Sequence, residues 1–112
     1  VRVPVLEDTV EELLHEMGRA SEPVRTPNGS SDVGNVSYHC PAIQPLLTIG
    51  DTFYALHTPE FREETLKEPA HQAIADGAKL LGSLVLRALT DEEFRDAAQK
   101  SYLAQKEKKL NP

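Results

Sequence analysis

The segment after Pro69 constrains the fold of this chain more than any other, because it carries the longest run of helical hydrophobic periodicity. Apolar residues recur at every third or fourth position, which predicts one long amphipathic helix over residues 69–89. We expect a broad buried face on this helix, with Ile74, Ala78, Leu81 and Val85 facing a sheet that small residues allow to approach closely. The apolar stripe consists of these four residues with Ala70 and Ala88, and it is widened by Ala73, Gly77, Leu80 and Leu84.

Three further helices are predicted from capping signals. Asp8-Thr9-Val10-Glu11 reads as a capping box that opens a first helix, and Gly18 is its expected stop. Thr58 followed by Pro59 predicts a helix start, because Thr can accept from a free N–H of the first turn and Pro lacks the N–H that would go unbonded there. A second capping box, Thr90-Asp91-Glu92-Glu93, opens the last helix.

Two short strands are predicted between the first and second of these helices. Residues 36–40 alternate between apolar and polar, and residues 46–49 form a second apolar run with β-branched members. A loop rich in Pro, Asn, Gly and Ser precedes them over 21–31. The order helix, strand, strand, helix, helix, helix predicts an α/β fold in which helices cover a small sheet of two or three strands. Because so few strands make a poor sheet alone, we expect residues 1–112 to be one unit that completes a larger sheet.

Composition argues against several classes of function. The net charge of −6 argues against a nucleic-acid partner, and no apolar run is long enough to cross a membrane. The single cysteine, Cys40, excludes an internal disulfide, and we expect it to be a buried small hydrophobe rather than a nucleophile. No signal-peptide leader is visible, so a cytoplasmic protein is expected. The chain begins with Val1 instead of Met, which fits a processed, trimmed or fragmentary polypeptide.

His57 is the first candidate for chemistry. It follows an apolar run and precedes a predicted helix start, which would place it at the end of the sheet, where ligands of α/β folds bind. A neutral imidazole there can ligate a divalent metal, and the alternative is a histidine that bonds a backbone carbonyl beside the helix. Asp32 and Asn35 lie in a glycine-punctuated turn, where they either approach a ligand or satisfy the backbone in an Asx-turn.

Two motifs taken together resemble a known family. Residues 29–37, Gly-Ser-Ser-Asp-Val-Gly-Asn-Val-Ser, resemble the block Gly-Ser-Thr-Asp-(Val/Met)-Gly-Asn-Val-Ser, and residues 56–61, Leu-His-Thr-Pro-Glu-Phe, look like the late metal-ligand motif. Both are found in metal-dependent amidohydrolases and peptidases of the aminoacylase and carboxypeptidase G superfamily, among them p-aminobenzoyl-glutamate hydrolases. The family block continues into Pro-x-Ile-His-Pro, whereas this chain has Gln44 in place of the His, which puts substrate specificity in doubt.

The resemblance implies that the chain is the C-terminal portion of a zinc-peptidase-like catalytic domain. By that match His57 binds the second ion of a two-metal centre of zinc or manganese, Asp32 orders a loop close to the metals, and Asn35 and Ser37 line the substrate side. The complete enzyme would hydrolyse the amide bond of N-acyl amino acids, p-aminobenzoyl-glutamate-like compounds or small dipeptides. This chain alone would lack the other ligands and the general-base glutamate, and is expected to be inactive and to bind no metal tightly.

Two kinds of partner follow from these expectations. The implied enzyme binds a small-molecule amide and needs the missing N-terminal part of the same protein, and a homo-oligomer is possible as well. The alternative function is a non-enzymatic interaction module that uses an open sheet edge and an apolar helix face to bind another chain.

Overall fold

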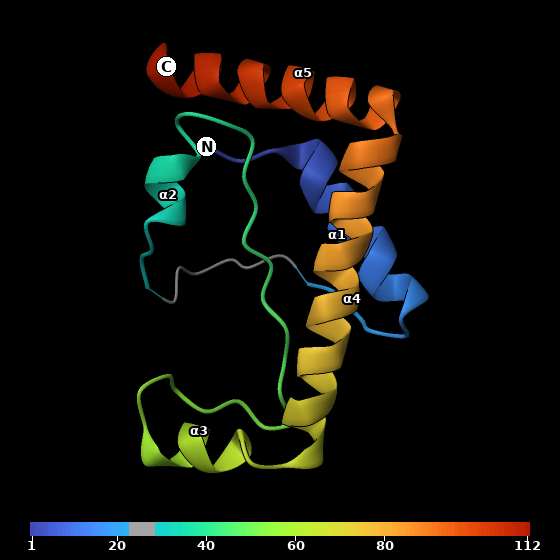
Figure 1. Ribbon diagram of the computed structural model, residues 1–112. Helices are drawn as coiled ribbons and strands as arrows, with labels where there is room; N and C mark the ends of the chain where they lie inside the picture. Colours follow the sequence, from blue (N-terminus) through green and yellow to red (C-terminus); the bar gives the residue numbers. More distant parts are fainter. Residues whose placement is uncertain (23–28) are drawn as a thin grey trace.

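The computed structural model describes residues 1–22 and 29–112, and its regular structure is helical. It contains α1 (Pro4–Glu16), α2 (Val33–Val36), α3 (Pro59–Glu64), α4 (Glu68–Thr90) and α5 (Glu92–Leu110). Figure 1 shows α4 as the long axis of the molecule, with α5 crossing one of its ends and α3 near the other. No β-strand occurs in the described residues, so the predicted α/β fold with a small sheet is wrong.

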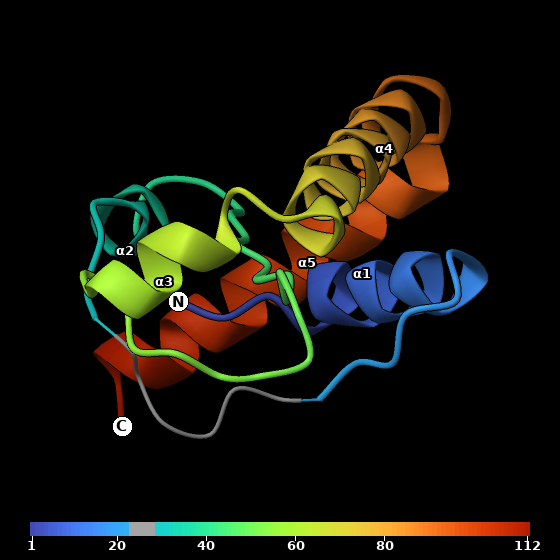
Figure 2. The ribbon, with the colours of Figure 1, turned by 90° about the horizontal axis from the view of Figure 1, so that it is seen from below.

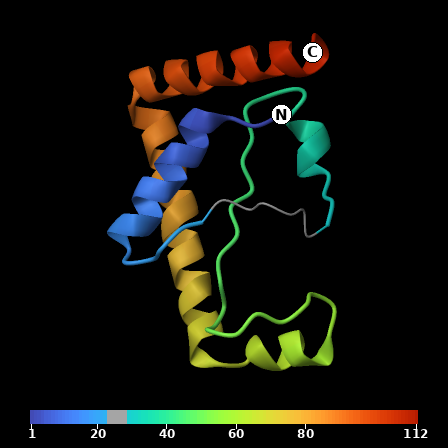
Figure 3. The same cartoon turned by 180° about the vertical axis from the view of Figure 1, so that it is seen from behind.

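The two predicted strands lack the neighbours that a sheet requires. The first is replaced by α2 and the turn that follows it, and the second lies in a non-helical segment, residues 41–55, that runs alongside α4 (Figures 1 and 3). Within the described part of the chain no backbone–backbone hydrogen bond involves this segment. Pro41 and Pro45 also remove two of its N–H donors. A strand is stable only when a second strand pairs with it, and the apolar pattern cannot show whether that partner exists.

The core lies where α1 packs against α4. Val10 and Leu14 of α1 and Leu80 of α4 form its buried centre, and Leu80 is 1% exposed. Figure 2 shows α1 beside α4, with α5 crossing both. The non-helical segment adds Leu47, whose Cδ1 lies 3.4 Å from where a Cβ on Gly77 would be. The segment thus packs closely on α4 at Gly77, where the sequence predicted a sheet, although a Cβ at this distance would make only an ordinary van der Waals contact.

The buried face of α4 differs from the predicted one. Ala70, Ala73 and Leu80, which the sequence placed on or beside the apolar stripe, are buried, whereas the four residues that we expected to face a sheet are exposed. The apolar surface of α4 covers two adjacent sides of the helix, and α1 with the non-helical segment covers one of them. We call the other side the uncovered stripe; it consists of Ile74, Ala78, Leu81, Val85 and Leu89, of which the four large side chains are 73%, 56%, 58% and 73% exposed.

The helix ends show which capping predictions hold. Thr58 caps α3, as predicted, by accepting a hydrogen bond from the N–H of Phe61 at 3.2 Å. The first capping box is wrong, because α1 begins earlier, with Pro4 in its first turn. The second is displaced by one residue, since Asp91 and not Thr90 accepts from the N–H of Phe94. The predicted loop over 21–31 lies partly outside the described residues, which omit 23–28.

Gly18 ends α1 as predicted, and the turn that it makes directs the next residue toward α4. Gly18 has a φ of 79°, and the N–H of Arg19 donates to the carbonyl of Leu14 at 2.9 Å, as in a Schellman motif. The Arg19 guanidinium then donates to Asp76 at 2.7 Å and to the carbonyl of Thr48 at 3.3 Å. This cluster joins α1, α4 and the non-helical segment.

Asp76 is the anionic centre of this cluster. Its second oxygen accepts a hydrogen bond from Gln72 at 3.0 Å, and its side chain is 13% exposed. Hydrogen bonds from Arg19 and then Gln72 lower the pKa of the Asp76 carboxyl, because they favour its charged form. A carboxylate on the buried side of an apolar helix is therefore explained by its partners.

Leu80 and Leu81 provide a matched pair that tests which face of α4 is buried. Leu80→Ala should lower the free energy of unfolding by about 2–5 kcal/mol, because it leaves a cavity in the core. Leu81→Ala changes the same residue type one position away, on the uncovered stripe, and should cost less than about 1 kcal/mol. Urea unfolding at low protein concentration, followed by circular dichroism, measures both. Equal losses would contradict the orientation of α4.

Asp76→Asn tests the Arg19–Asp76–Gln72 cluster through its pH dependence. Since the folded-state pKa lies below the unfolded one, the carboxylate stabilises the fold above the unfolded pKa, and this contribution is lost as pH falls through the folded pKa. The variant should be less stable than the wild type at pH 7, and the difference should shrink below about pH 4. Asp96→Asn, on the exposed side of α5, is the control. A difference that stays constant from pH 7 to pH 3 would contradict the assignment.

Candidate functional site

His57 lies in the turn that connects the non-helical segment to α3. Its side chain is exposed, and its φ of 63° is positive, which no other non-glycine residue in the described part of the chain shows. A left-handed conformation costs a residue with a Cβ roughly 1–2 kcal/mol, so the surrounding turn must impose it. The described residues contain no sheet at whose end His57 could lie, but its predicted position before a helix start is confirmed.

The hydroxyl of Thr58 is the group that holds this turn together. It donates to the carbonyl of Ala55 at 2.6 Å and accepts from the N–H of Phe61 at 3.2 Å. The first bond encloses His57, whereas the second lies after it and caps α3. No hydrogen bond or ion pair to the His57 imidazole occurs among the described residues, so that the ring is open to a ligand.

Asp32 and Asn35 lie in or beside α2, and both are exposed. Asp32 occupies the position before the first residue of α2, but its side chain makes no capping hydrogen bond. The local turn is instead held by Ser31, whose Oγ accepts from the N–H of Val33 at 3.1 Å and donates to Oε1 of Gln44 at 2.9 Å. The Asx-turn that we considered as an alternative is therefore replaced by a serine turn, and both candidate side chains are left open.

Ser37 differs from these two residues, because it is buried. It is 4% exposed, and its hydroxyl donates to the carbonyl of Gly34 at 2.6 Å and accepts from the amino group of Val1 at 2.7 Å. In this conformation its hydroxyl has no face open to a substrate.

The structure does not bring the candidate residues into one site. Figures 1 and 3 show α2 and α3 at different levels along α4. No hydrogen bond or ion pair among the described residues joins His57 to Asp32, Asn35 or Ser37. Within the described ranges, no three residues of the types His, Cys, Asp and Glu lie close enough together to hold a metal ion. The described residues therefore do not by themselves form a metal centre.

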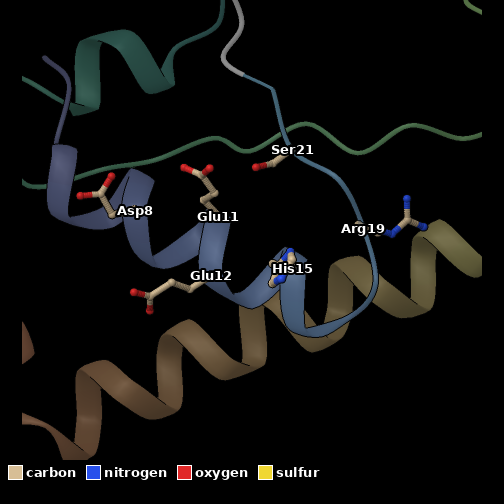
Figure 4. A pocket seen from close by; sticks show the side chains of 6 residues that line it. All are labelled: Asp8, Glu11, Glu12, His15, Arg19 and Ser21. Atoms are coloured by element: carbon tan, nitrogen blue, oxygen red, sulfur yellow. The ribbon is translucent and has the colours of Figure 1, made fainter.

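A shallow hollow on α1 brings several titratable groups together. It is lined by Asp8, Glu11, Glu12, His15, Arg19 and Ser21. Figure 4 shows that the three carboxylates extend from α1 in different directions and do not converge on one point. Arg19 is already bound to Asp76. We interpret this hollow as the solvated side of α1.

The sequence analysis gave a wrong environment for Cys40 and missed the role of Asp76. Cys40 is exposed, so its predicted burial as a small hydrophobe is wrong; the residue follows the turn after α2 instead of lying in a strand. The sequence analysis did not predict a role for Asp76. Its position within the apolar run of residues 70–89 was nevertheless a signal in the sequence for a buried ion pair.

Comparisons with known proteins give no family for this chain. No protein-family model, no curated protein and no solved structure matches it. Among the described helices, none combines the length and the hydropathy that a membrane span needs. The case for a function therefore depends on the residues themselves.

Proposed function

We propose that this chain is the C-terminal portion of the catalytic domain of a metal-dependent amidohydrolase, to which it contributes His57 as one metal ligand. The observation that carries the proposal is the exposed His57 imidazole, held at positive φ directly before a Pro-started helix, within a sequence motif that resembles the family's late metal-ligand motif. Residues in sparsely populated backbone conformations are concentrated at functional sites, which supports a role for this turn.

The proposed substrates are those that the resemblance implies: N-acyl amino acids, p-aminobenzoyl-glutamate-like compounds or small dipeptides. Two zinc or manganese ions would polarise the scissile carbonyl and activate water in the complete enzyme. Asp32 and Asn35 are exposed and can serve as loop-ordering and substrate-side residues, whereas Ser37 can do so only if its two hydrogen bonds open. We also propose that the enzyme acts in the cytoplasm, a reducing compartment with which its exposed free cysteine is compatible.

The rest of the centre must come from polypeptide outside these 112 residues. One imidazole cannot hold two ions, and the described residues provide no cluster to complete the set. The uncovered stripe of α4 supports the same conclusion, because a helix with an apolar surface on two sides is normally buried on both. We propose that the uncovered stripe packs against that remaining polypeptide in the complete enzyme, meaning the protein that contains this chain and the other ligands.

The uncovered stripe also supports the second candidate function, a non-enzymatic interaction module. The open sheet edge that we first considered is excluded from the described residues by the absence of strands. The apolar helix face remains, with four large side chains more than half exposed along one side of α4. Fully burying one such side chain contributes about 1.5–3 kcal/mol, and association would gain the part of this free energy that corresponds to the surface still exposed. The two candidate functions differ in whether activity depends on His57: the amidohydrolase requires it as a metal ligand, and the interaction module does not.

His57→Ala in the complete enzyme tests the first candidate. The substitution removes a direct ligand, so we expect loss of one of the two bound ions and a decrease in turnover of at least about 100-fold, with little change in folding. His71→Ala, which changes an exposed histidine in the first turns of α4, is the control and should leave both unchanged. Metal content by atomic spectrometry and hydrolysis of an N-acyl amino acid measure the effect. Unchanged metal content and turnover would contradict the first candidate and would leave His57 with only a structural role in the turn.

Sedimentation of the isolated chain tests the uncovered stripe. We expect concentration-dependent self-association, because exposed apolar side chains along one helix face associate in the absence of their usual cover. Leu81→Glu should weaken it by placing a charge in the contact. Gln99→Glu adds the same charge on the exposed side of α5 and should have no effect. A wild-type chain that stays monomeric up to millimolar concentration would contradict the role of the stripe.

A further inference from the structure

The side chains that α4 and α5 turn inward form one continuous series across the junction of the two helices. From Ala73 to Lys106 the buried and half-buried positions recur every three or four residues, and the positions between them are mostly exposed. Around the junction this series consists of Leu84, Arg87, Asp91, Phe94, Ala98 and Tyr102. Such spacing is that of one face of a single α-helix. The buried face of α5 therefore has the phase that it would have if α4 continued through the junction without a bend.

The bend itself involves a single non-helical residue, Asp91, which has φ −120° and ψ 97°. Its own N–H still donates to the carbonyl of Arg87 at 2.9 Å, as in an α-helix. Two side chains then hold the bend. The Asp91 carboxylate accepts from the N–H of Phe94 at 3.0 Å, and the Arg95 guanidinium donates to the carbonyl of Ala88 at 2.7 Å. In an unbroken helix these two backbone groups would be bonded to other backbone groups instead.

Nothing in the covalent structure of this region requires a bend. The chain contains no proline between Pro69 and Pro112, and the nearest glycine before the bend is Gly82. Sharp bends in helices usually occur at proline or at glycine, and neither residue is present at this junction. A continuous helix through Asp91 is therefore open to this sequence, and it would restore the backbone hydrogen bonds that the bend interrupts.

The contacts that hold α5 in its bent position are few. It lies against α1, and Ala98 and Tyr102 are its buried residues (Figure 2). The Oγ of Ser101 accepts from the N–H of Val5, in the first turn of α1, at 3.4 Å. Tyr102 is 2% exposed, but its hydroxyl has no hydrogen-bond partner in the described part of the chain, which makes this burial less favourable. None of these contacts requires that α1 and α5 belong to the same molecule.

We propose that two copies of this chain exchange α5, so that the α5 of each copy lies on the α1 of the other. In this dimer Asp91 is helical, α4 and α5 form one continuous helix in each copy, and the α1–α5 contacts are those that already exist within one chain. Exchange of an identical element needs no new contact surface, which makes it a low-cost route to a dimer. Association costs translational freedom, so the dimer forms at high protein concentration. The uncovered stripe and His57 take no part in it.

The first measurement is a disulfide that reports whether α5 lies on its own α1 or on that of another copy. Val5→Cys and Ser101→Cys place thiols on the two sides of this contact, in a chain whose own cysteine is removed by Cys40→Ser. The protein is refolded from urea at increasing concentration and then oxidised. Electrophoresis under denaturing, non-reducing conditions separates a bond within one chain from a bond between two. A dimer held through the uncovered stripe alone would migrate as a monomer, so the two kinds of association are distinguished.

Two substitutions at the bend should shift the result in opposite directions. Asp91→Ala removes the cap of α5 and introduces a strong helix former, so the fraction of covalent dimer should increase at least about threefold. Glu92→Pro suits the first turn of a separate α5 but breaks a continuous helix, so the covalent dimer should be lost while the bond within one chain still forms. A bond within one chain in all three proteins at every concentration would overturn the proposal. A covalent dimer that is as abundant in Glu92→Pro as in Asp91→Ala would overturn it as well.

The second measurement does not depend on a disulfide. Spin labels at Lys79→Cys and Glu107→Cys, again with Cys40→Ser, would be about 42 Å apart along a continuous helix, at 1.5 Å per residue. The bend between α4 and α5 brings these positions closer together (Figure 1). In the Asp91→Ala dimer, diluted with unlabelled chains, electron paramagnetic resonance should show the longer distance, and in Glu92→Pro the shorter one. An Asp91→Ala dimer that keeps the shorter distance would overturn the exchange of α5.

Discussion

The packing of Leu80 between Val10 and Leu14 is the contact on which the rest of this structure depends. It places α1 along one side of α4, and the Arg19–Asp76 pair then closes the end of the same interface. Ile43 and Leu47 of the non-helical segment pack against this core as well. The position of the segment that leads to His57 is therefore a consequence of how α1 meets α4.

The same contact leaves α4 half covered. A helix with an apolar surface on two adjacent sides needs cover on both, and the described residues cover only one of these sides. The uncovered stripe and the single candidate metal ligand are the two observations behind the proposal that further polypeptide completes this chain. A non-enzymatic binding module would explain the first of these observations but gives no reason for the exposed, left-handed His57.

Local signals predicted much of the helical structure and little of the tertiary arrangement. Periodicity defined α4 to within one residue at each end, and Thr58 with Pro59 marked the start of α3, because caps depend on neighbours in sequence. The sequence did not determine which face of α4 is buried. Leu80 and Leu81 both belong to its apolar surface, and only the position of the neighbouring helix determines which of the two is buried. The prediction of strands was wrong for the same reason. The alternation of apolar and polar residues over 36–40 indicates only a local preference for extended backbone, whereas a β-sheet also needs a second strand to pair with. For the candidate site, the sequence correctly predicted that His57 is exposed. The positive φ of His57 and the burial of Ser37 could not be predicted from the short motifs that contain them.

The central claim is that His57 binds a metal ion in a centre completed outside this chain. Anomalous X-ray diffraction from crystals of the complete enzyme, recorded on both sides of the absorption edge of its bound metal, tests it most directly. We predict an anomalous peak at a coordination distance of about 2.0–2.2 Å from an imidazole nitrogen of His57, with the other ligands drawn from residues outside these 112. A metal centre elsewhere in the protein, with the His57 imidazole in contact with solvent or a backbone carbonyl, would contradict the claim.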